Sequence, residues 1–246
     1  MSELVAVESV DEVAVVRMQR PPANAMEPGL LAAGADVVAR LRSERPAAVV
    51  ITGSGDFFSG GVDLKLAPTL SADEQRGMVH GINRLFYEWY GFPGPVVAAV
   101  NGHAVAGGMI LALCADHRVG SRSGRYGHTE VRVGAPYPVA ALTVVRAELA
   151  PGPARRLVLG GELVGADIAL ALGLLDELAD AGAVLDRALA VARELAALPA
   201  ATYETVKAQL RGSELQAMRA GMERDPLAGG WLGDETADAA RAALDG

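Results

Sequence analysis

The sequence has a single cysteine, Cys114, among 246 residues. No intrachain disulfide can form, which is typical of proteins in a reducing compartment, and we expect a cytoplasmic one. Cys114 lies in an apolar run, so we interpret it as a small core residue rather than as a nucleophile. The first residues, MSELVAVESV, lack a basic segment followed by an apolar core, so they do not predict a signal peptide.

Basic residues are fewer than acidic ones. Lys and Arg number 22 against 30 Asp and Glu, which leaves a net charge of −8. A nucleic-acid partner would require a basic face to neutralise phosphates, so this composition argues against one. A small anionic ligand remains compatible with it, because backbone dipoles act strongly at short range.

No Asp, Glu, Lys or Arg occurs in residues 89–115. A membrane-spanning helix needs about 20 apolar residues, so the run is long enough on paper. Gly91, Pro93, Gly94 and Pro95 divide it into pieces too short to span. We therefore predict that the run is buried in a globular core and that the protein has no membrane partner.

Short apolar strands alternate with helices in the first half of the chain. The β-branched residues near the N-terminus predict two strands with a turn at residues 10–12. Helical spacing of leucine and valine predicts a helix over residues 28–42, and a second helix is expected over 72–90. Buried strands are expected near residues 47–53, 94–102 and 116–121. This order indicates the α/β class.

The second half is rich in alanine and leucine and predicts mainly helices. Each helical piece begins or ends at Gly or Pro, at residues 138–150, 152–161, 165–175, 181–199, 201–212 and 213–228. We expect these helices to pack partly on the sheet and partly in an oligomer contact. The predicted division is a core over residues 1–180 and a helical C-terminal region over 181–246.

Several familiar motifs are missing or incomplete. Gly53-Ser54-Gly55 follows a strand, but a dinucleotide fingerprint needs a third glycine where Phe58 stands. Neither GxxxxGK[ST] nor GxSxG occurs. The 4 histidines show no metal-ligand spacing, so no metal site is predicted.

Two glycine pairs follow buried strands, one in FFSGGVDL (residues 57–64) and one in NGHAVAGGMIL (residues 101–111). If the strands are neighbours, both loops emerge at one edge with free backbone N–H groups. Two such donors converging on one point form an oxyanion hole. The alternative is that the glycines only permit tight turns and close packing, and the residues alone leave both open.

Four blocks in order, RPPANAM, FFSGGVDL, NGHAVAGG with LALCADHRV, and YGHTEVRVG, resemble the crotonase superfamily, the enoyl-CoA hydratase/isomerase family. The resemblance covers residues 4–180. It implies an α/β fold, a spiral of ββα turns with a C-terminal helical region, assembled as a homotrimer or a dimer of trimers. It also implies an acyl-CoA substrate, with coenzyme A as part of the thioester and no separate cofactor.

The same resemblance implies which residues hold the substrate. The backbone N–H groups of Val62 and Gly107 would bind the thioester oxygen. Lys65 would reach a phosphate, although a solvated surface lysine is an equal alternative. The acyl pocket would take its size from the helix over 72–90. Adenine and pantetheine would meet mainly the backbone around Ala23, Asn24, Ala25, Asp63 and Leu64.

Hydratases of this family use two glutamates that hold a water between them. One stands three residues after the oxyanion glycine, where this sequence has Ile110. The other corresponds to Glu130. One carboxylate is enough to carry a proton from C2 to C4 of a 3-enoyl-CoA, with Ile110 as an apolar wall that excludes water. We therefore predict an isomerase.

Alternatives remain open. The chain could be a hydratase of low or altered activity, or a non-catalytic protein that binds acyl-CoA. Glu130 could also serve only to start a helix. His128, two residues before Glu130, is a further candidate for moving protons, since its orientation does not follow from the sequence.

Overall fold

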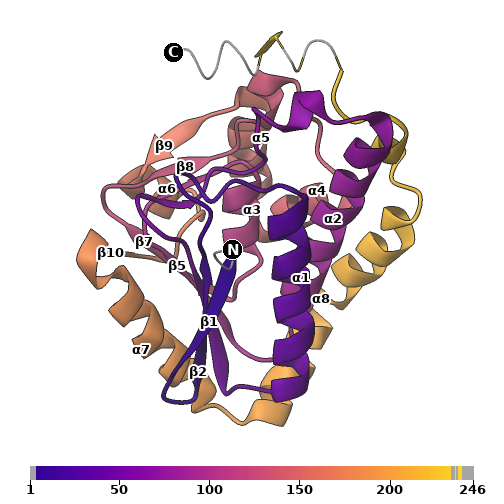
Figure 1. The fold of residues 1–246 in the computed structure, drawn as a ribbon. Coiled ribbons are helices and arrows are strands. Elements are labelled where there is room, and N and C mark those ends of the chain that lie inside the picture. Colours follow the sequence, from indigo (N-terminus) through magenta and orange to yellow (C-terminus); the bar gives the residue numbers. More distant parts are fainter. Residues whose placement is uncertain (1–3, 234–235, 237, 240–246) are drawn as a thin grey trace.

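The computed structural model describes residues 4–233, 236, 238 and 239, and it contains two sheets (Figure 1). A 6-stranded sheet has the order β1-β2-β3-β5-β7-β10, and a 4-stranded sheet has the order β4-β6-β8-β9. The larger sheet comprises β1 (Val5–Val10), β2 (Val13–Met18), β3 (Ala48–Thr52), β5 (Val96–Val100), β7 (His117–Ser121) and β10 (Glu177–Ala179). The smaller comprises β4 (Phe57–Ser59), β6 (His103–Val105), β8 (Arg125–Gly127) and β9 (Leu163–Gly165).

The pairing directions place the glycine loops. β1 and β2 form an antiparallel hairpin, and the other neighbours in the larger sheet are parallel. Every residue of β3 and β5 is buried, as expected for parallel strands covered on both faces. Since β3 and β5 are parallel neighbours, the segments that follow them leave the sheet at the same edge.

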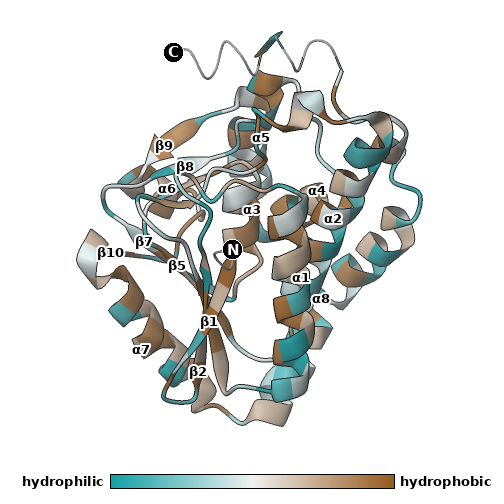
Figure 2. Ribbon diagram, viewed as in Figure 1, coloured by the Kyte–Doolittle hydropathy of each residue, from teal (hydrophilic) through white to brown (hydrophobic). Residues whose placement is uncertain are grey.

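Helices cover both faces of the larger sheet (Figure 1). The long helices α1, α2 and α8 share one side with α3 and α4, while α7 lies on the other. Figure 2 shows hydrophobic residues along the central strands and hydrophilic ones on the outer helices. The bounds are α1 Pro28–Glu44, α2 Ala72–Tyr90, α3 Gly107–Leu113, α4 Val139–Glu148, α5 Pro151–Gly160, α6 Ala166–Ala171, α7 Val184–Ala196 and α8 Ala200–Met222, with 3₁₀ turns η1 Ala67–Thr69, η2 Glu130–Val133, η3 Ala181–Ala183 and η4 Pro226–Gly229.

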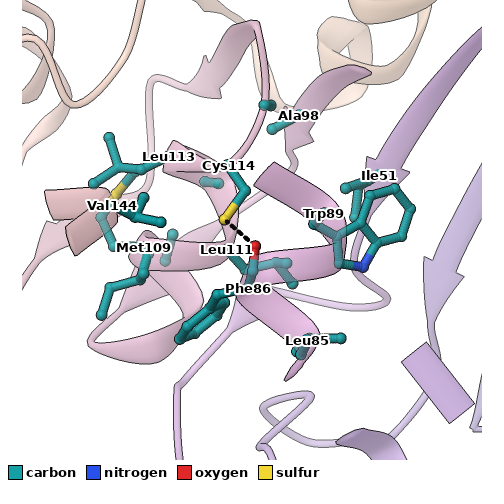
Figure 3. Close-up of a cluster of buried hydrophobic side chains, with 14 of the residues drawn as sticks. Ile51, Leu85, Phe86, Trp89, Ala98, Met109, Leu111, Leu113, Cys114 and Val144 are labelled. Atoms are coloured by element: carbon teal, nitrogen blue, oxygen red, sulfur yellow. Dashed lines mark hydrogen bonds between the residues drawn. The ribbon is translucent and has the colours of Figure 1, made fainter. Parts of the chain in front are cut away.

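The uncharged run of residues 89–115 is buried in the core, as predicted. Cys114 is fully buried, and its Sγ lies 3.8 Å from the carbonyl oxygen of Phe86 among apolar side chains (Figure 3). Burial raises the pKa of the Cys114 thiol, which keeps it unreactive. No helix in the described part of the chain is both long enough and apolar enough to span a bilayer.

The α/β prediction is confirmed, and α2 has the predicted bounds. A capping box between Ser71 and Glu74 begins α2 where the sequence indicated. The smaller sheet was not predicted, since its strands have only 3 residues each and three residues show no periodicity.

The predicted helix end at Gly212 is wrong, because α8 continues through it to Met222. Lys207 and Arg211 on this helix are buried and bind Asp116. Arg211 also donates to the carbonyls of Tyr90 and Cys114. These contacts offset the roughly 1 kcal/mol that an interior glycine costs a helix.

The C-terminal helices pack closely on the rest of the chain. α7 supplies Val184, Ala188 and Ala192 to the hydrophobic cluster on the second face of the larger sheet. α8 packs on α2 and α4. The role of the region after residue 180 in an oligomer stays a prediction.

Candidate active site

A pocket of about 50 Å³ lies where the two glycine loops meet α2, α4 and η2. A larger hollow of about 180 Å³ lies between α1, α7 and α8 and shares no lining residue with it. The smaller pocket is lined by Met26, Gly60, Val62, Leu64, Ile82, Phe86, Ala106, Gly107, Ile110, Glu130, Val133, Ala135, Pro136, Tyr137, Pro138, Ala141 and Trp231. Glu130 is the one charged side chain among these residues.

The two glycine loops come into contact, as the sequence predicted. Gly61 has φ +80°, and a Cβ atom there would lie 3.0 Å from the Gly107 nitrogen. Both Val62 and Gly107 line the pocket. Within residues 4–233, their N–H groups donate no hydrogen bond to a backbone carbonyl. Two free donors facing one pocket fit the oxyanion-hole interpretation, which stays a prediction.

Ala106 holds the peptide bond that carries the Gly107 N–H. Its φ of 52° and ψ of −126° lie in a region that residues with a side chain rarely adopt. Its N–H donates to the Gly127 carbonyl, and its carbonyl accepts from the N–H groups of Met109 and Ile110. Such a conformation costs about 1–3 kcal/mol and persists only where surrounding contacts enforce it.

Gly107 and Gly108 differ in what surrounds them. A Cβ atom at Gly108 would lie 2.1 Å from the Ser59 carbonyl oxygen, so α3 can approach β4 only with glycine there. A Cβ atom at Gly107 would meet the flexible Met26 side chain, with Sδ at 3.2 Å. Gly108 is therefore required for the close packing of α3 on β4. Gly107 is less crowded, because a side chain there would first meet the flexible side chain of Met26.

Glu130 is the first residue of η2 and is 9% exposed. Its Oε2 accepts a hydrogen bond of 2.8 Å from the Tyr137 hydroxyl. Its Oε1 is buried and has no hydrogen-bond partner in the described part of the chain. One oxygen is thus held, and the other is buried without a hydrogen-bond partner among the described residues.

Sequence reasoning missed Tyr137. It stands seven positions after Glu130, beyond the turn at Gly134, and no continuous helix or strand joins the two. Burial, and then the charge and hydrogen bond of Glu130, raise the pKa of the Tyr137 hydroxyl. The phenol therefore stays protonated and remains a donor to Glu130 at any ordinary pH.

His128 is fully buried and lies behind Glu130 rather than in the pocket. Its Nδ1 is 4.0 Å from the Oε1 of Glu130, which is too far for a hydrogen bond. Neither ring nitrogen has a hydrogen-bond partner among the described residues. Ile110, in contrast, lines the pocket with Glu130 and is 2% exposed. The two positions that the sequence compared therefore face the same space.

The segment with Ala23, Asn24 and Ala25 is fastened to the first glycine loop. Gly60 donates its N–H to the Ala23 carbonyl, and Met26 exchanges backbone hydrogen bonds with Gly61 and Asp63. The Asn24 amide is fully buried and donates to the carbonyls of Ser54 and Phe57. Because that side chain is used inside the protein, a substrate contact there would come from backbone atoms.

Asp63 forms an ion pair of 2.6 Å with Arg20. Burial acts to raise its pKa, but the hydrogen bonds from Arg20, Leu66 and Lys65 outweigh it and lower the pKa. Asp63 thereby orders the loop next to Val62. Leu64 lines the pocket, and Lys65 is exposed. The predicted coenzyme A contacts of these residues stay predictions.

Within the part of the chain that the structure describes, no group of three or more His, Cys, Asp or Glu residues could hold a metal ion. The polar side chains that line the pocket are Glu130 and Tyr137, and the other lining side chains are apolar.

Known proteins have similar sequences and the same fold. The profile of the enoyl-CoA hydratase/isomerase family matches residues 8–225. A putative enoyl-CoA hydratase of Thermus thermophilus is 38% identical over 194 residues, 78% of this chain and 76% of that protein. A Mycobacterium tuberculosis protein, called an enoyl-CoA isomerase in one structure and a probable enoyl-CoA hydratase in another, is 33% identical. The first of these structures has a TM-score of 0.84 over 91% of this chain and 97% of that one.

Human mitochondrial Δ3-Δ2-enoyl-CoA isomerase shares the fold, with a TM-score of 0.90 at 23% identity over 98% of this chain and 97% of that one. The fold and the paired glycine loops define a crotonase-type protein. The chain belongs to the enoyl-CoA hydratase/isomerase family, so the resemblance noted in the sequence is confirmed.

Proposed function

We propose that this chain isomerises a 3-enoyl-CoA to the 2-enoyl-CoA. The observation that carries the proposal is the single carboxylate of the pocket, Glu130, with one oxygen held by Tyr137 and the other without a partner. Ile110 stands where a hydratase of the family would have its first glutamate. Water addition needs one group to activate water and another to protonate carbon, whereas proton transfer needs only one.

In this reaction the Oε1 of Glu130 removes a proton from C2 of the bound thioester. The electrons of that C–H bond form a C1–C2 double bond, and the π electrons of the C1–O bond move onto the oxygen. The negative oxygen of this dienolate accepts hydrogen bonds from the N–H groups of Val62 and Gly107. Glu130 then returns the proton to C4, which leaves the double bond between C2 and C3. The apolar walls around Ile110 and Phe86 exclude water from the dienolate.

The coenzyme A part of the substrate would lie on the loops with Ala23–Ala25 and Asp63–Leu64, with Lys65 near a phosphate. A homotrimer or a dimer of trimers is part of the same proposal. Exposed apolar side chains such as Val131, Leu159 and Ile168 support a subunit contact. The buried, reduced Cys114 is in keeping with a cytoplasmic location.

The test is an assay of purified protein with a 3-enoyl-CoA and, separately, with a 2-enoyl-CoA in water. We expect isomerisation of the first by the wild type, no isomerisation by Glu130→Gln, and unchanged activity in Glu44→Gln, whose carboxylate is exposed on α1. Efficient hydration of the 2-enoyl-CoA with no isomerisation would refute the proposal.

A hydratase of altered activity is the second candidate, and His128 favours it. Its Nδ1 lies 4.0 Å from the Oε1 of Glu130. Its position outside the pocket lining speaks against direct contact with a substrate. Loss of hydration in His128→Gln, with the wild type active, would support this candidate. Binding of acyl-CoA with no turnover of either substrate would instead indicate a non-catalytic member.

A further inference from the structure

The segment of residues 225–232, called the strap here, passes from the end of α8 along α2 toward the loop before α4 (Figure 1). Its first residue, Asp225, is 5% exposed. The Oδ2 of Asp225 accepts hydrogen bonds from the Asn83 amide at 2.7 Å and from the Val139 N–H at 2.9 Å. Asn83 and Val139 belong to α2 and α4, so one buried carboxylate fastens the strap to both helices.

The far end of the strap is fastened as well. The indole N–H of Trp231 donates to the Pro136 carbonyl at 2.8 Å, and the Leu232 N–H donates to the Gln75 side chain at 3.0 Å. Arg76 donates to the Ala228 carbonyl at 3.1 Å between these points. The strap is therefore anchored along its length, and the ring of Trp231 has a defined place.

Trp231 forms part of the pocket wall. It is 5% exposed and lines the pocket together with Ile82 and Phe86 of α2 and Ala141 of α4. The expectation that helix 72–90 shapes the acyl pocket therefore accounts for only part of that wall. An indole is the largest side chain available to close such a space, and its hydrogen bond to Pro136 restrains it from swinging aside.

The size and polarity of the pocket limit what fits. A cavity measured in this way needs about 10–15 Å³ for each water-sized group. The pocket of about 50 Å³ is therefore small, and its lining favours a short acyl chain. Apart from Glu130 the lining has no charged side chain, so a second charge on the acyl chain would be left unpaired.

We propose that the strap makes this protein selective for short, uncharged acyl chains, with Trp231 as the wall that excludes longer ones. The identity of the acyl-CoA as the substrate rests on the proposed function. The size limit itself concerns binding, so it can be tested with saturated thioesters, which have no double bond to move. A failure of the isomerase proposal would leave this test intact.

The experiment measures the affinity of the wild type for butyryl-, hexanoyl-, octanoyl- and decanoyl-CoA by calorimetry, with free coenzyme A as the reference. One methylene in a matched apolar pocket changes binding by about 10-fold or more. We expect affinity to rise from butyryl- to hexanoyl-CoA and to stop rising, or fall, at the two longer chains. Steady tightening through decanoyl-CoA would overturn the proposal, and this series requires no variant.

Two variants then assign the wall to Trp231. Trp231→Leu should bind octanoyl- and decanoyl-CoA about 10-fold more tightly than the wild type does, because it opens space beyond the chain. Trp231→Phe, which is closer in size and keeps an aromatic ring, should give a smaller shift in the same direction.

The matched control is Leu227→Ala. Leu227 belongs to the strap and packs on the core but does not line the pocket. Its truncation therefore removes a strap side chain while the pocket wall and the hydrogen bond of Trp231 to Pro136 stay in place. We expect no change in chain-length preference for it. A folded Trp231→Leu or Trp231→Phe protein, as judged by circular dichroism, with the wild-type preference would overturn the assignment. An equal shift in Leu227→Ala would overturn it too.

Discussion

The hydrogen bond from Tyr137 to Glu130 makes the sharpest prediction about the site. The bond is 2.8 Å long, and Glu130 is only 9% exposed to solvent. Oε1 has no partner among the described residues, so Tyr137 is the group that fixes which carboxylate oxygen faces the substrate. In Tyr137→Phe both oxygens would be unheld, and the carboxylate could rotate away from the position between C2 and C4.

A hydrogen bond to a charged group contributes about 1.5–3 kcal/mol. If that orientation is needed for the transition state, its loss lowers kcat by about 10- to 100-fold. KM should change little, because the N–H groups of Val62 and Gly107 and the coenzyme A contacts are untouched. The assay is steady-state isomerisation of a 3-enoyl-CoA, with the transfer of the C2 deuterium of a labelled substrate to C4 as a second readout. A rotating carboxylate should lose more of the label to solvent.

The chain offers a matched control in Tyr90. Its hydroxyl donates to the Oε1 of Glu148 at 2.9 Å, a tyrosine–glutamate bond of the same kind outside the pocket. Tyr90→Phe should cost stability but leave kcat and label transfer unchanged. Wild-type kcat in Tyr137→Phe, with Glu130→Gln inactive, would refute the reasoning. An equal loss of kcat in Tyr90→Phe would show that the effect is only structural.

Four further substitutions test other parts of the site and the fold. Ile110→Glu places a second carboxylate beside Glu130 and should introduce hydration of a 2-enoyl-CoA; a folded variant with no hydration would show that this side chain has no access to the substrate. Gly108→Ala puts a Cβ atom 2.1 Å from the Ser59 carbonyl and should lower the free energy of unfolding in urea by about 1–3 kcal/mol, whereas Gly107→Ala, which meets a flexible methionine, should lower it less. Equal losses would contradict the packing role of Gly108. Asp63 has a pKa below its ordinary value of 3.8, so its stabilising effect is present above pH 3.8 and is lost as the pH falls below it. The free energy of unfolding of Asp63→Asn should therefore fall less steeply below that pH than that of the wild type, and parallel curves would contradict the inference.

Local patterns in the sequence were sufficient for β1, β2, β3, β5 and β7 and for the helices α1 and α2, whereas β10 was not predicted. The buried strands β3 and β5 follow from short apolar runs. The 3-residue strands of the smaller sheet did not emerge, because their pairing depends on partners far apart in the chain. The prediction at Gly212 was wrong for the same reason, since the buried contacts of α8 are made with Cys114 and Asp116, which lie in a turn distant in sequence.

The residues of the candidate site also fall into those that the sequence predicted and those that only the structure revealed. The sequence by itself determined the family and the single carboxylate. This was possible because Gly107, Ile110 and Glu130 belong to short motifs whose order and spacing can be recognised in the sequence. Tyr137 and Trp231 acquire their places only when η2, α2, α4 and the strap pack together. A hydrogen bond across a turn and a pocket wall from the far end of the chain depend on distances in space. The tertiary structure alone therefore decided which oxygen of Glu130 is free and where the pocket ends.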